Sequence, residues 1–163
     1  MKRNIALFIL CAAVVIALDQ ITKAAITSRF FMQESYGVID GFVNIVYVIN
    51  PGAAFGFLAG ASVTFRYIFF IGITVIAILL IIYYLIKSKS GSIVTVISLA
   101  LIFAGAVGNL IDRIRFGAVV DFLDVYVGTW HWPAFNVADS AISIGAALMI
   151  WEMIVRRKNG NAS

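Results

Sequence analysis

The feature that most constrains the fold is an apolar stretch from Tyr67 to Ile86, which runs for twenty residues without a charged side chain. A helix rises about 1.5 Å per residue, so about twenty residues cross the roughly 30 Å hydrocarbon core of a bilayer. Two basic residues, Lys87 and Lys89, follow the stretch, as is typical where a helix leaves the bilayer. The stretch therefore predicts a transmembrane helix over 67–86.

Three further segments have the same character and lie at about 5–25, 93–113 and 136–155. The chain is 63% hydrophobic and only 12% charged, whereas soluble domains carry about 25% charged residues. The first segment contains an apolar run of fourteen residues, the length of a signal-peptide core. Its helical pattern continues past Asp19, however, which favours a retained span. We therefore predict a single polytopic membrane domain over residues 1–163.

The region at about 30–60 differs from these spans because aromatic residues, β-branched residues and glycines alternate along it. Asp40-Gly41 separates two such runs, and this dipeptide is a strong signal for a two-residue hairpin turn. An open sheet edge cannot be satisfied in lipid, so the sheet must lie outside the hydrocarbon core. The predicted fold is an all-α membrane protein of four transmembrane helices with a small extracytoplasmic β-sheet, and 114–135 is expected to be a loop on the same side.

The basic residues indicate the orientation of the chain. The net charge is +4 and the isoelectric point is about 9.4, but the basic residues cluster at the ends of apolar segments rather than in one stripe. That distribution argues against a nucleic-acid partner and follows the positive-inside rule of membrane proteins. With four spans, both termini are expected in the cytoplasm, on the side that receives seven of the twelve basic residues: Lys2, Arg3, Lys87, Lys89, Arg156, Arg157 and Lys158.

The same topology brings polar residues together at the outer ends of the spans. An ionisable group at membrane depth costs at least ~2.5–3.5 kcal/mol on insertion scales, so each one is a functional hypothesis by default. Seven polar residues converge there in the predicted topology: Asp19, Asn50, Asn109, Arg113, Asp121, Asn136 and Asp139. We therefore expect a functional site near the outer face of the membrane.

Each of these residues also has a structural alternative. Asp19 and Lys23 have the i,i+4 spacing of a helical ion pair at the membrane surface. Asn136 and Asp139 have the spacing of a helix cap with an acid three residues on. In its structural alternative, Asp124 simply faces solvent. In the same structural alternative, three more charged residues reach water at the interface: Asp112, Arg113 and Arg115.

The available residue types limit the chemistry of such a site. His131 is the only histidine, and neither His-Glu-x-x-His nor Gly-x-Ser-x-Gly occurs, so zinc hydrolysis and a serine triad are disfavoured. Nothing in the spacing of the carboxylates demands a metal, and no cofactor is predicted. Two carboxylates held close at low dielectric share a proton, so one can act as base on a water and the other as acid toward a carbonyl.

Five short motifs resemble, in order and spacing, those of lipoprotein signal peptidase, also called signal peptidase II. They cover nearly the whole chain, and their combination is far more specific than any one of them. The motifs are Asp19-Gln-Ile-Thr-Lys23, Asn50-Pro-Gly-Ala-Ala-Phe-Gly56, Gly108-Asn-Leu-Ile-Asp-Arg113, Val119-Val-Asp-Phe122 and Phe135-Asn-Val-Ala-Asp139.

The resemblance implies an aspartic endopeptidase of the bacterial cytoplasmic (inner) membrane. It would remove the signal peptide from prolipoproteins by cleaving before the diacylglyceryl-modified cysteine. It implies that Asp121 and Asp139 form the catalytic dyad, and that Asp112 and Asp124 do not belong to it. The resemblance also assigns residues to substrate binding: Asp19, Lys23, Asn50, Gly52, Asn109, Arg113 and Asn136.

Further expectations follow from the same resemblance. Partners would be prolipoproteins, membrane lipids and inhibitors of the globomycin type, and a mobile segment at about 124–133 would cover the site. The aromatic residues of that region also fit an interfacial belt. Two other functions remain open at this level: a small transporter or proton relay that uses the same polar cluster, and a structural membrane subunit. The Gly-x-Gly-Asp signature of presenilin-type peptidases is absent.

Overall fold

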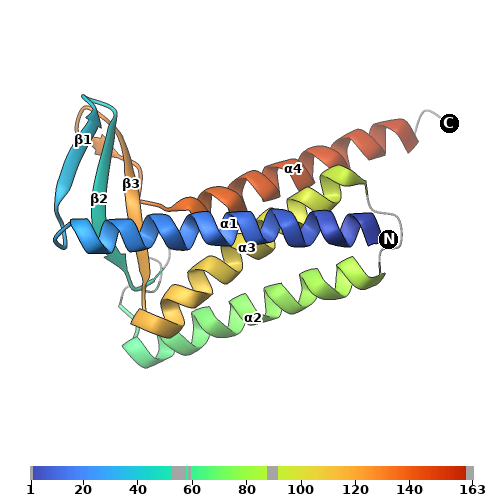
Figure 1. Cartoon of the computed structure of the whole chain (residues 1–163), viewed down its shortest axis with the longest axis horizontal. Helices are drawn as coiled ribbons and strands as arrows, with labels where there is room; N and C mark the ends of the chain where they lie inside the picture. The colour runs from blue at the N-terminus through green and yellow to red at the C-terminus, as the bar shows by residue number, and fades with distance from the viewer. Residues whose placement is uncertain (1, 53–57, 59, 88–91, 161–163) are drawn as a thin grey trace.

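The computed structural model describes residues 2–52, 58, 60–87 and 92–160, and it forms a helical bundle with a small sheet at one end (Figure 1). Both termini lie at the end of the bundle that is remote from the sheet (Figure 1). The helices are α1 (Lys2–Arg29), α2 (Val63–Lys87), α3 (Ile93–Phe116) and α4 (Val137–Gly160). The strands are β1 (Ser35–Ile39), β2 (Val43–Asn50), β3 (Val119–Val127) and β4 (Trp130–His131).

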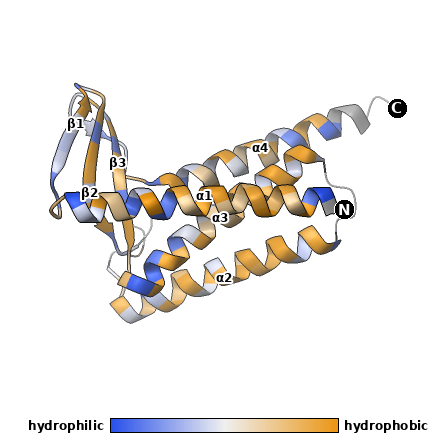
Figure 2. Ribbon diagram, in the orientation of Figure 1, coloured by the Kyte–Doolittle hydropathy of each residue, from blue (hydrophilic) through white to orange (hydrophobic). Residues whose placement is uncertain are grey.

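Within the described part of the chain, four helices are long and apolar enough to cross a membrane. Figure 2 shows hydrophobic residues along the length of the helices and hydrophilic ones mostly toward their ends. Each helix extends beyond the predicted span at one end or both, and cap residues are seen at the two ends of α3. Ser92 accepts a hydrogen bond from the backbone of Thr95 at the start of α3, and Gly117 ends that helix with φ of 73°. The chain is a multi-pass membrane protein.

Helix α3 is the central element, because it packs against each of the other three helices. Small residues allow this close approach. A Cβ added at Gly108 would lie 2.5 Å from Oδ2 of Asp19 on α1, and one at Gly105 would collide with the backbone of Ala138 on α4. The glycines of α3 therefore bring α1 and α4 close enough for their polar residues to meet.

The sheet is antiparallel, with its strands in the order β1-β2-β3-β4. The predicted hairpin forms, but its turn has three residues rather than two: Asp40, Gly41 and Phe42 join β1 to β2, and Gly41 has a φ of 75°. Two stretches of the sequence prediction, Ala53–Gly56 of the second motif and Lys89, lie outside the described residues.

The segment 114–135 differs from the loop that the sequence predicts, because β3 and β4 form within it. Strand β3 pairs with β2 from Asn50↔Val119 to Val43↔Val125. Without β3, the second edge of β2 would leave its N–H and C=O groups unpaired. The pairing partner lies about 70 residues away in the sequence, so no local turn signal reveals it.

Candidate active site

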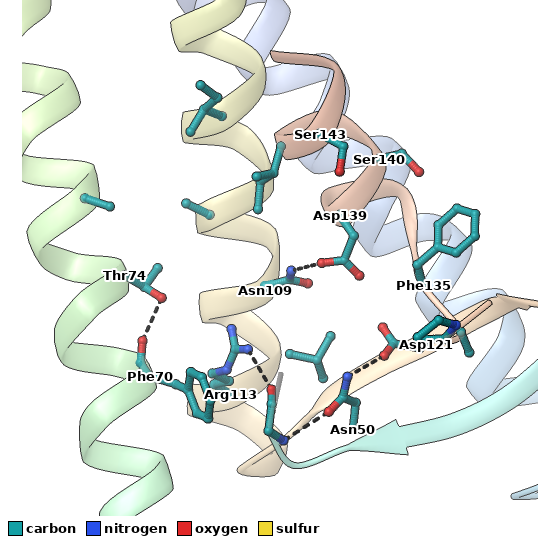
Figure 3. Close-up of a pocket in the computed structure, with 18 of the residues that line it drawn as sticks. Asn50, Phe70, Thr74, Asn109, Arg113, Asp121, Phe135, Asp139, Ser140 and Ser143 are labelled. Atoms are coloured by element: carbon teal, nitrogen blue, oxygen red, sulfur yellow. Dashed lines mark hydrogen bonds between the residues drawn. The ribbon is translucent and has the colours of Figure 1, made fainter. Parts of the chain in front are cut away.

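A cavity of about 840 Å³ lies between α2, α3 and α4 and ends at the sheet. Its membrane portion is lined by apolar side chains such as Phe70, Ile73 and Ile102, while polar groups gather at the sheet end. Figure 3 shows the Asp121 and Asp139 carboxylates at that polar end, one from β3 and one from α4. The cavity thus joins an apolar groove to two carboxyl groups.

Asp121 enters the site from β3 and is only 2% exposed. Its Oδ2 accepts a hydrogen bond from Nδ2 of Asn50 at 2.9 Å, and its Oδ1 accepts one from Nδ2 of Asn136 at 2.7 Å. Burial, helped by the nearby charge of Asp139, raises the pKa of Asp121 from its ordinary 3.8 to about 7. The two asparagine hydrogen bonds oppose this shift without cancelling it.

Asp139 lies in the first turn of α4 and takes part in the predicted helix cap. The backbone N–H of Asp139 donates to Oδ1 of Asn136 at 2.9 Å, and the backbone N–H of Asn136 donates back to Oδ2 of Asp139 at 3.3 Å. This reciprocal capping box is confirmed. Oδ1 of Asp139 accepts a further hydrogen bond from Nδ2 of Asn109 at 2.8 Å. The capping role and a role in the site are therefore compatible.

Two asparagines connect the two acids. Asn136 is fully buried, and its Nδ2 donates to Asp121 and also to Oδ1 of Asn109 at 3.3 Å. Asn109 in turn donates from its Nδ2 to Asp139. A continuous run of side-chain hydrogen bonds therefore leads from Asp121 through both amides to Asp139.

A buried cation lies behind this run. Nζ of Lys23 lies 2.9 Å from Asp19 and 2.8 Å from Asp112, and it donates to Oδ1 of Asn109 at 3.0 Å. The predicted i,i+4 pair of Asp19 and Lys23 is confirmed, but its expected place at the surface is wrong, because the two residues are 0% and 3% exposed. The reason is the glycine-mediated approach of α3, which covers both side chains.

The alternative in which Asp112 reaches water is wrong, because it is 1% exposed. The chain turns back after α3, so that the backbone N–H of Val120 donates to Oδ2 of Asp112 at 3.1 Å.

Gln20 was not singled out from the sequence. Its Nε2 donates to Asp19 at 3.1 Å and to Asp112 at 3.2 Å, and a polar residue beside Asp19 in an apolar helix was the available signal.

Arg113 lines the cavity at its polar end. Nη2 of Arg113 donates to the carbonyl of Gly52 at 3.4 Å, and its guanidinium lies over the ring of Phe70 at 5.1 Å (Figure 3). Asn50 fixes the same turn, since its Oδ1 accepts from the N–H of Gly52 at 3.0 Å. The side chain is therefore held between the sheet and α2 rather than free in water.

Asp124 lies on the opposite face of β3 from Asp121, because side chains three residues apart on a strand point to opposite faces. The alternative in which it faces solvent is wrong, since Asp124 is 8% exposed. Nδ2 of Asn44 donates to its Oδ2 at 3.0 Å, and Nδ1 of His131 lies 2.8 Å from its Oδ1. Asp124 is not among the residues that line the described cavity.

The structure divides the residues that the sequence predicts for the site into two groups. Those that line the cavity are Asn50, Gly52, Asn109, Arg113, Asp121 and Asp139. Those buried behind its wall are Asp19, Lys23 and Asn136. The second group supports the first through hydrogen bonds: Lys23 donates to Asn109, and Asn136 donates to Asp121. Asp19 accepts a hydrogen bond from the backbone of α4 at Ala138.

Comparisons with known proteins identify the family of the chain. A family model described as signal peptidase (SPase) II matches residues 11–155. The lipoprotein signal peptidase of Syntrophus aciditrophicus is 56% identical over 97% of this chain and 98% of its own length. That of Geobacter sulfurreducens is 50% identical over 85% of this chain and 86% of its own length.

Solved structures show the same fold. One bacterial membrane enzyme determined by the in meso method matches with a TM-score of 0.84 at 38% identity, over 93% of this chain and 90% of that one. A second matches with a TM-score of 0.81 at 36% identity, over 90% of this chain and 91% of that one. Since both the family model and close relatives span most of its length, the chain belongs to the signal peptidase II family.

Proposed function

We propose that this protein is a lipoprotein signal peptidase, an endopeptidase that removes the signal peptide from prolipoproteins before the diacylglyceryl-modified cysteine. The observation that carries the proposal is the pair of carboxyl groups, the buried Asp121 and the half-buried Asp139, at the polar end of an apolar cavity. A transporter would not need two acids placed beside a groove of a size that suits acyl chains. Membership of the signal peptidase II family also favours the peptidase over the transporter.

The chemistry we propose uses the two acids in different protonation states. Asp121, whose pKa is raised to about 7 by burial, holds the proton and donates it to the carbonyl oxygen of the scissile bond. Asp139 lies at the N-terminus of α4, where the helix dipole favours a negative charge, and it accepts a proton from the attacking water. When the tetrahedral intermediate collapses, the C–N bond breaks, the departing amine takes that proton from Asp139, and Asp121 recovers its own proton from the hydroxyl that was the carbonyl oxygen.

The cavity suggests how a lipid-modified peptide is held. Asn50, Asn109 and Arg113 line the polar end, where they would orient the peptide backbone near the dyad. The acyl chains would occupy the apolar portion between α2 and α4. Asp19, Lys23 and Asn136 lie behind the wall, so we propose that they act by positioning Asn109 and the dyad rather than by touching the substrate. Inhibitors of the globomycin type would occupy the same cavity.

The test of this function is cleavage by the purified protein in lipid. A synthetic prolipoprotein peptide carrying a diacylglyceryl cysteine is incubated with the reconstituted enzyme, and the products are identified by mass spectrometry. We expect one new N-terminus at the modified cysteine and much slower cleavage of the same peptide without the lipid. An intact peptide, together with a proton or ion flux in the same vesicles, would instead support the transporter.

We propose that the protein lies in the bacterial inner membrane with both termini in the cytoplasm and the dyad near the outer face. The support is the concentration of basic residues, including Arg3, Lys87 and Arg156, at the end of the bundle that carries both termini (Figure 1). The sheet, at the opposite end, would then face outward.

This orientation predicts the labelling of single cysteines. In a background where Cys11 is replaced by alanine, a cysteine at Gln33 or Glu34 is expected to react with a membrane-impermeant maleimide in intact spheroplasts, because both residues are exposed beside the sheet. A cysteine at Arg157 is expected to react only after the membrane is broken. The reverse pattern would overturn the proposed orientation.

The raised pKa of Asp121 predicts how activity depends on pH. Burial disfavours the charged form, so Asp121 loses its proton only as the pH rises through about 7, and kcat/KM falls above that pH. Asn50 stabilises the ionised form by a hydrogen bond. Asn50→Ala is therefore expected to move the alkaline limb of the kcat/KM profile to higher pH. A limb that stays in place or moves to lower pH would contradict the assignment of the proton to Asp121.

A further inference from the structure

One wall of the cavity is a short segment, residues 130–135, that returns along β3 after the turn at Gly128; we name it the rim segment. Four of its residues line the cavity: Trp132, Pro133, Ala134 and Phe135. None of them carries a carboxylate, an amide or another group that could take part in the proton transfers. The rim segment therefore contributes to the shape of the site rather than to its chemistry.

Backbone hydrogen bonds tie the rim segment to β3 at both of its ends. Tyr126 pairs with His131 at the start, and the N–H of Trp132 donates to the carbonyl of Val125 at 2.8 Å. At the far end, Phe135 and Leu123 exchange hydrogen bonds of 3.0 and 2.8 Å. Between these ties lies Pro133, which has no N–H to donate. The position of the middle of the segment thus depends on how firmly its ends are held.

At the start of the rim segment, side chains add a second attachment. Nδ1 of His131 lies 2.8 and 3.1 Å from the two carboxylate oxygens of Asp124. Since an ionised carboxylate can only accept, Nδ1 carries the hydrogen. The imidazole also stacks on the ring of Tyr126, with the ring centroids 4.8 Å apart and the planes inclined by 8°. His131 is thus held by β3 in two ways: its ring N–H bonds to the Asp124 carboxylate, and the face of its ring stacks on Tyr126.

Asp124 has no role in the proposed reaction, yet its side chain is only 11% exposed. Withdrawing a carboxylate from water is costly unless hydrogen bonds compensate. Its described partners are Asn44, from the neighbouring strand, and His131, from the rim segment. Asp124 is held in the sheet by its own strand, β3, and Asn44 adds a hydrogen bond from β2. The carboxylate can therefore anchor the rim segment through His131.

We propose that the hydrogen bond between His131 and Asp124 positions the rim segment, and that this residue pair thereby sets the affinity for the lipid-modified substrate. The proposal rests on the proposed function and adds two positioning residues to it. His131 and Asp124 do not line the described cavity, so they act through Trp132 and its neighbours. The effect is expected on substrate binding, with the turnover at the dyad little changed.

Two substitutions at His131 separate the hydrogen bond from the ring stacking. In His131→Asn, the amide nitrogen is bonded to Cγ as Nδ1 is, so the donor to Asp124 is kept and the stack on Tyr126 is lost. In His131→Phe, the stack is kept and the donor is lost. Asn44→Ala is the control for Asp124, because it removes the other partner of the same carboxylate without touching the rim segment.

Tryptophan fluorescence reports on the rim segment without relying on catalysis. The chain has three tryptophans, and with Trp151→Phe only Trp130 and Trp132 remain, both in this segment. We expect stronger acrylamide quenching and lower anisotropy in His131→Phe, and values close to the parent in His131→Asn and Asn44→Ala. Loosening in His131→Asn, or none in His131→Phe, would overturn the proposal. Loosening in Asn44→Ala to the same extent as in His131→Phe would also count against it.

Kinetics with the diacylglyceryl peptide give the second readout. His131→Phe is expected to raise KM roughly three- to tenfold at nearly constant kcat, as for a lost hydrogen bond to a charged group that is partly exposed to water. His131→Asn is expected to restore the parent KM. A fall in kcat with unchanged KM would contradict positioning of the substrate wall. If the parent protein cleaves nothing, the proposed function fails, while the fluorescence result still decides whether the pair holds the segment.

Discussion

Asp121→Asn and Asp139→Asn are each expected to lower the rate of prolipoprotein cleavage by a factor on the order of 10⁴ or more, as when one member of a catalytic unit is lost. Asparagine has nearly the same shape as aspartate but can neither give nor take the proton. An asparagine accepts only through Oδ1, so each variant keeps one of the two hydrogen bonds that its carboxylate accepts: from Asn50 or Asn136 at position 121, and from Asn109 or the backbone of Asn136 at position 139. Because one hydrogen bond remains at each position, the site is expected to stay folded and the loss of rate to come mainly from the missing proton transfer. The rate is measured by single-turnover product formation in lipid.

Asp40→Asn is the matched control for this experiment. It makes the same chemical change at an exposed position in the turn between β1 and β2, and Asn-Gly supports that turn as well as Asp-Gly does. We expect parental cleavage and an unchanged melting temperature in this variant, and only a small fall in the melting temperature of the two dyad variants, each of which loses one buried hydrogen bond. Full activity in either dyad variant would remove that residue from the proposed mechanism.

Lys23→Met is expected to destabilise the fold by about 3–5 kcal/mol, the usual range when one partner of a buried ion pair is removed. The ammonium group lies within 2.9 Å of Asp19 and within 2.8 Å of Asp112, and its side chain is only 4% exposed. Methionine fills a similar volume but leaves two carboxylates buried without their cation. The free energy of unfolding, or the melting temperature in detergent micelles, measures the loss.

Cleavage is also expected to fall in Lys23→Met, because Nζ holds Oδ1 of Asn109 and so directs its Nδ2 toward Asp139. Adding Asp112→Asn removes one of the uncompensated charges, so the double variant should regain roughly 0.5–3 kcal/mol of the stability lost in Lys23→Met. Unchanged stability in Lys23→Met would show that the buried carboxylates are neutral or reached by water. A double variant as unstable as Lys23→Met would show that the charge of Asp112 is not what the lysine compensates.

The sequence predicts the helices well because each is a local feature. An uncharged run such as 67–86 has only one way to satisfy its backbone in lipid, and that is as a helix. The hairpin at Asp40-Gly41 is local as well, since the turn residues themselves require the conformation that the structure shows. Strand β3 is different, because its pairing with β2 joins segments that no local pattern relates.

The same distinction applies to the buried charges. Asp112 and Asp124 look like surface acids in the sequence, yet each accepts hydrogen bonds from residues that the fold brings to it: Val120 and Gln20 for Asp112, and Asn44 and His131 for Asp124. Those partners depend on strand register and on the turn after α3. Polarity in the sequence shows that a residue needs a partner but does not identify that partner.

By itself, the sequence determined that this protein crosses the membrane several times and that its few polar residues gather at one end of the spans, because burying unpaired polar groups in lipid is too costly for any other arrangement. Its motifs also indicated the family. Only the tertiary structure decided which of those residues line the cavity, which lie behind it, and that Asp124 faces His131 rather than the dyad. The reason is that the close approach of α1 and α4 to α3, and the pairing of β3 with β2, are set by packing and register across the whole chain.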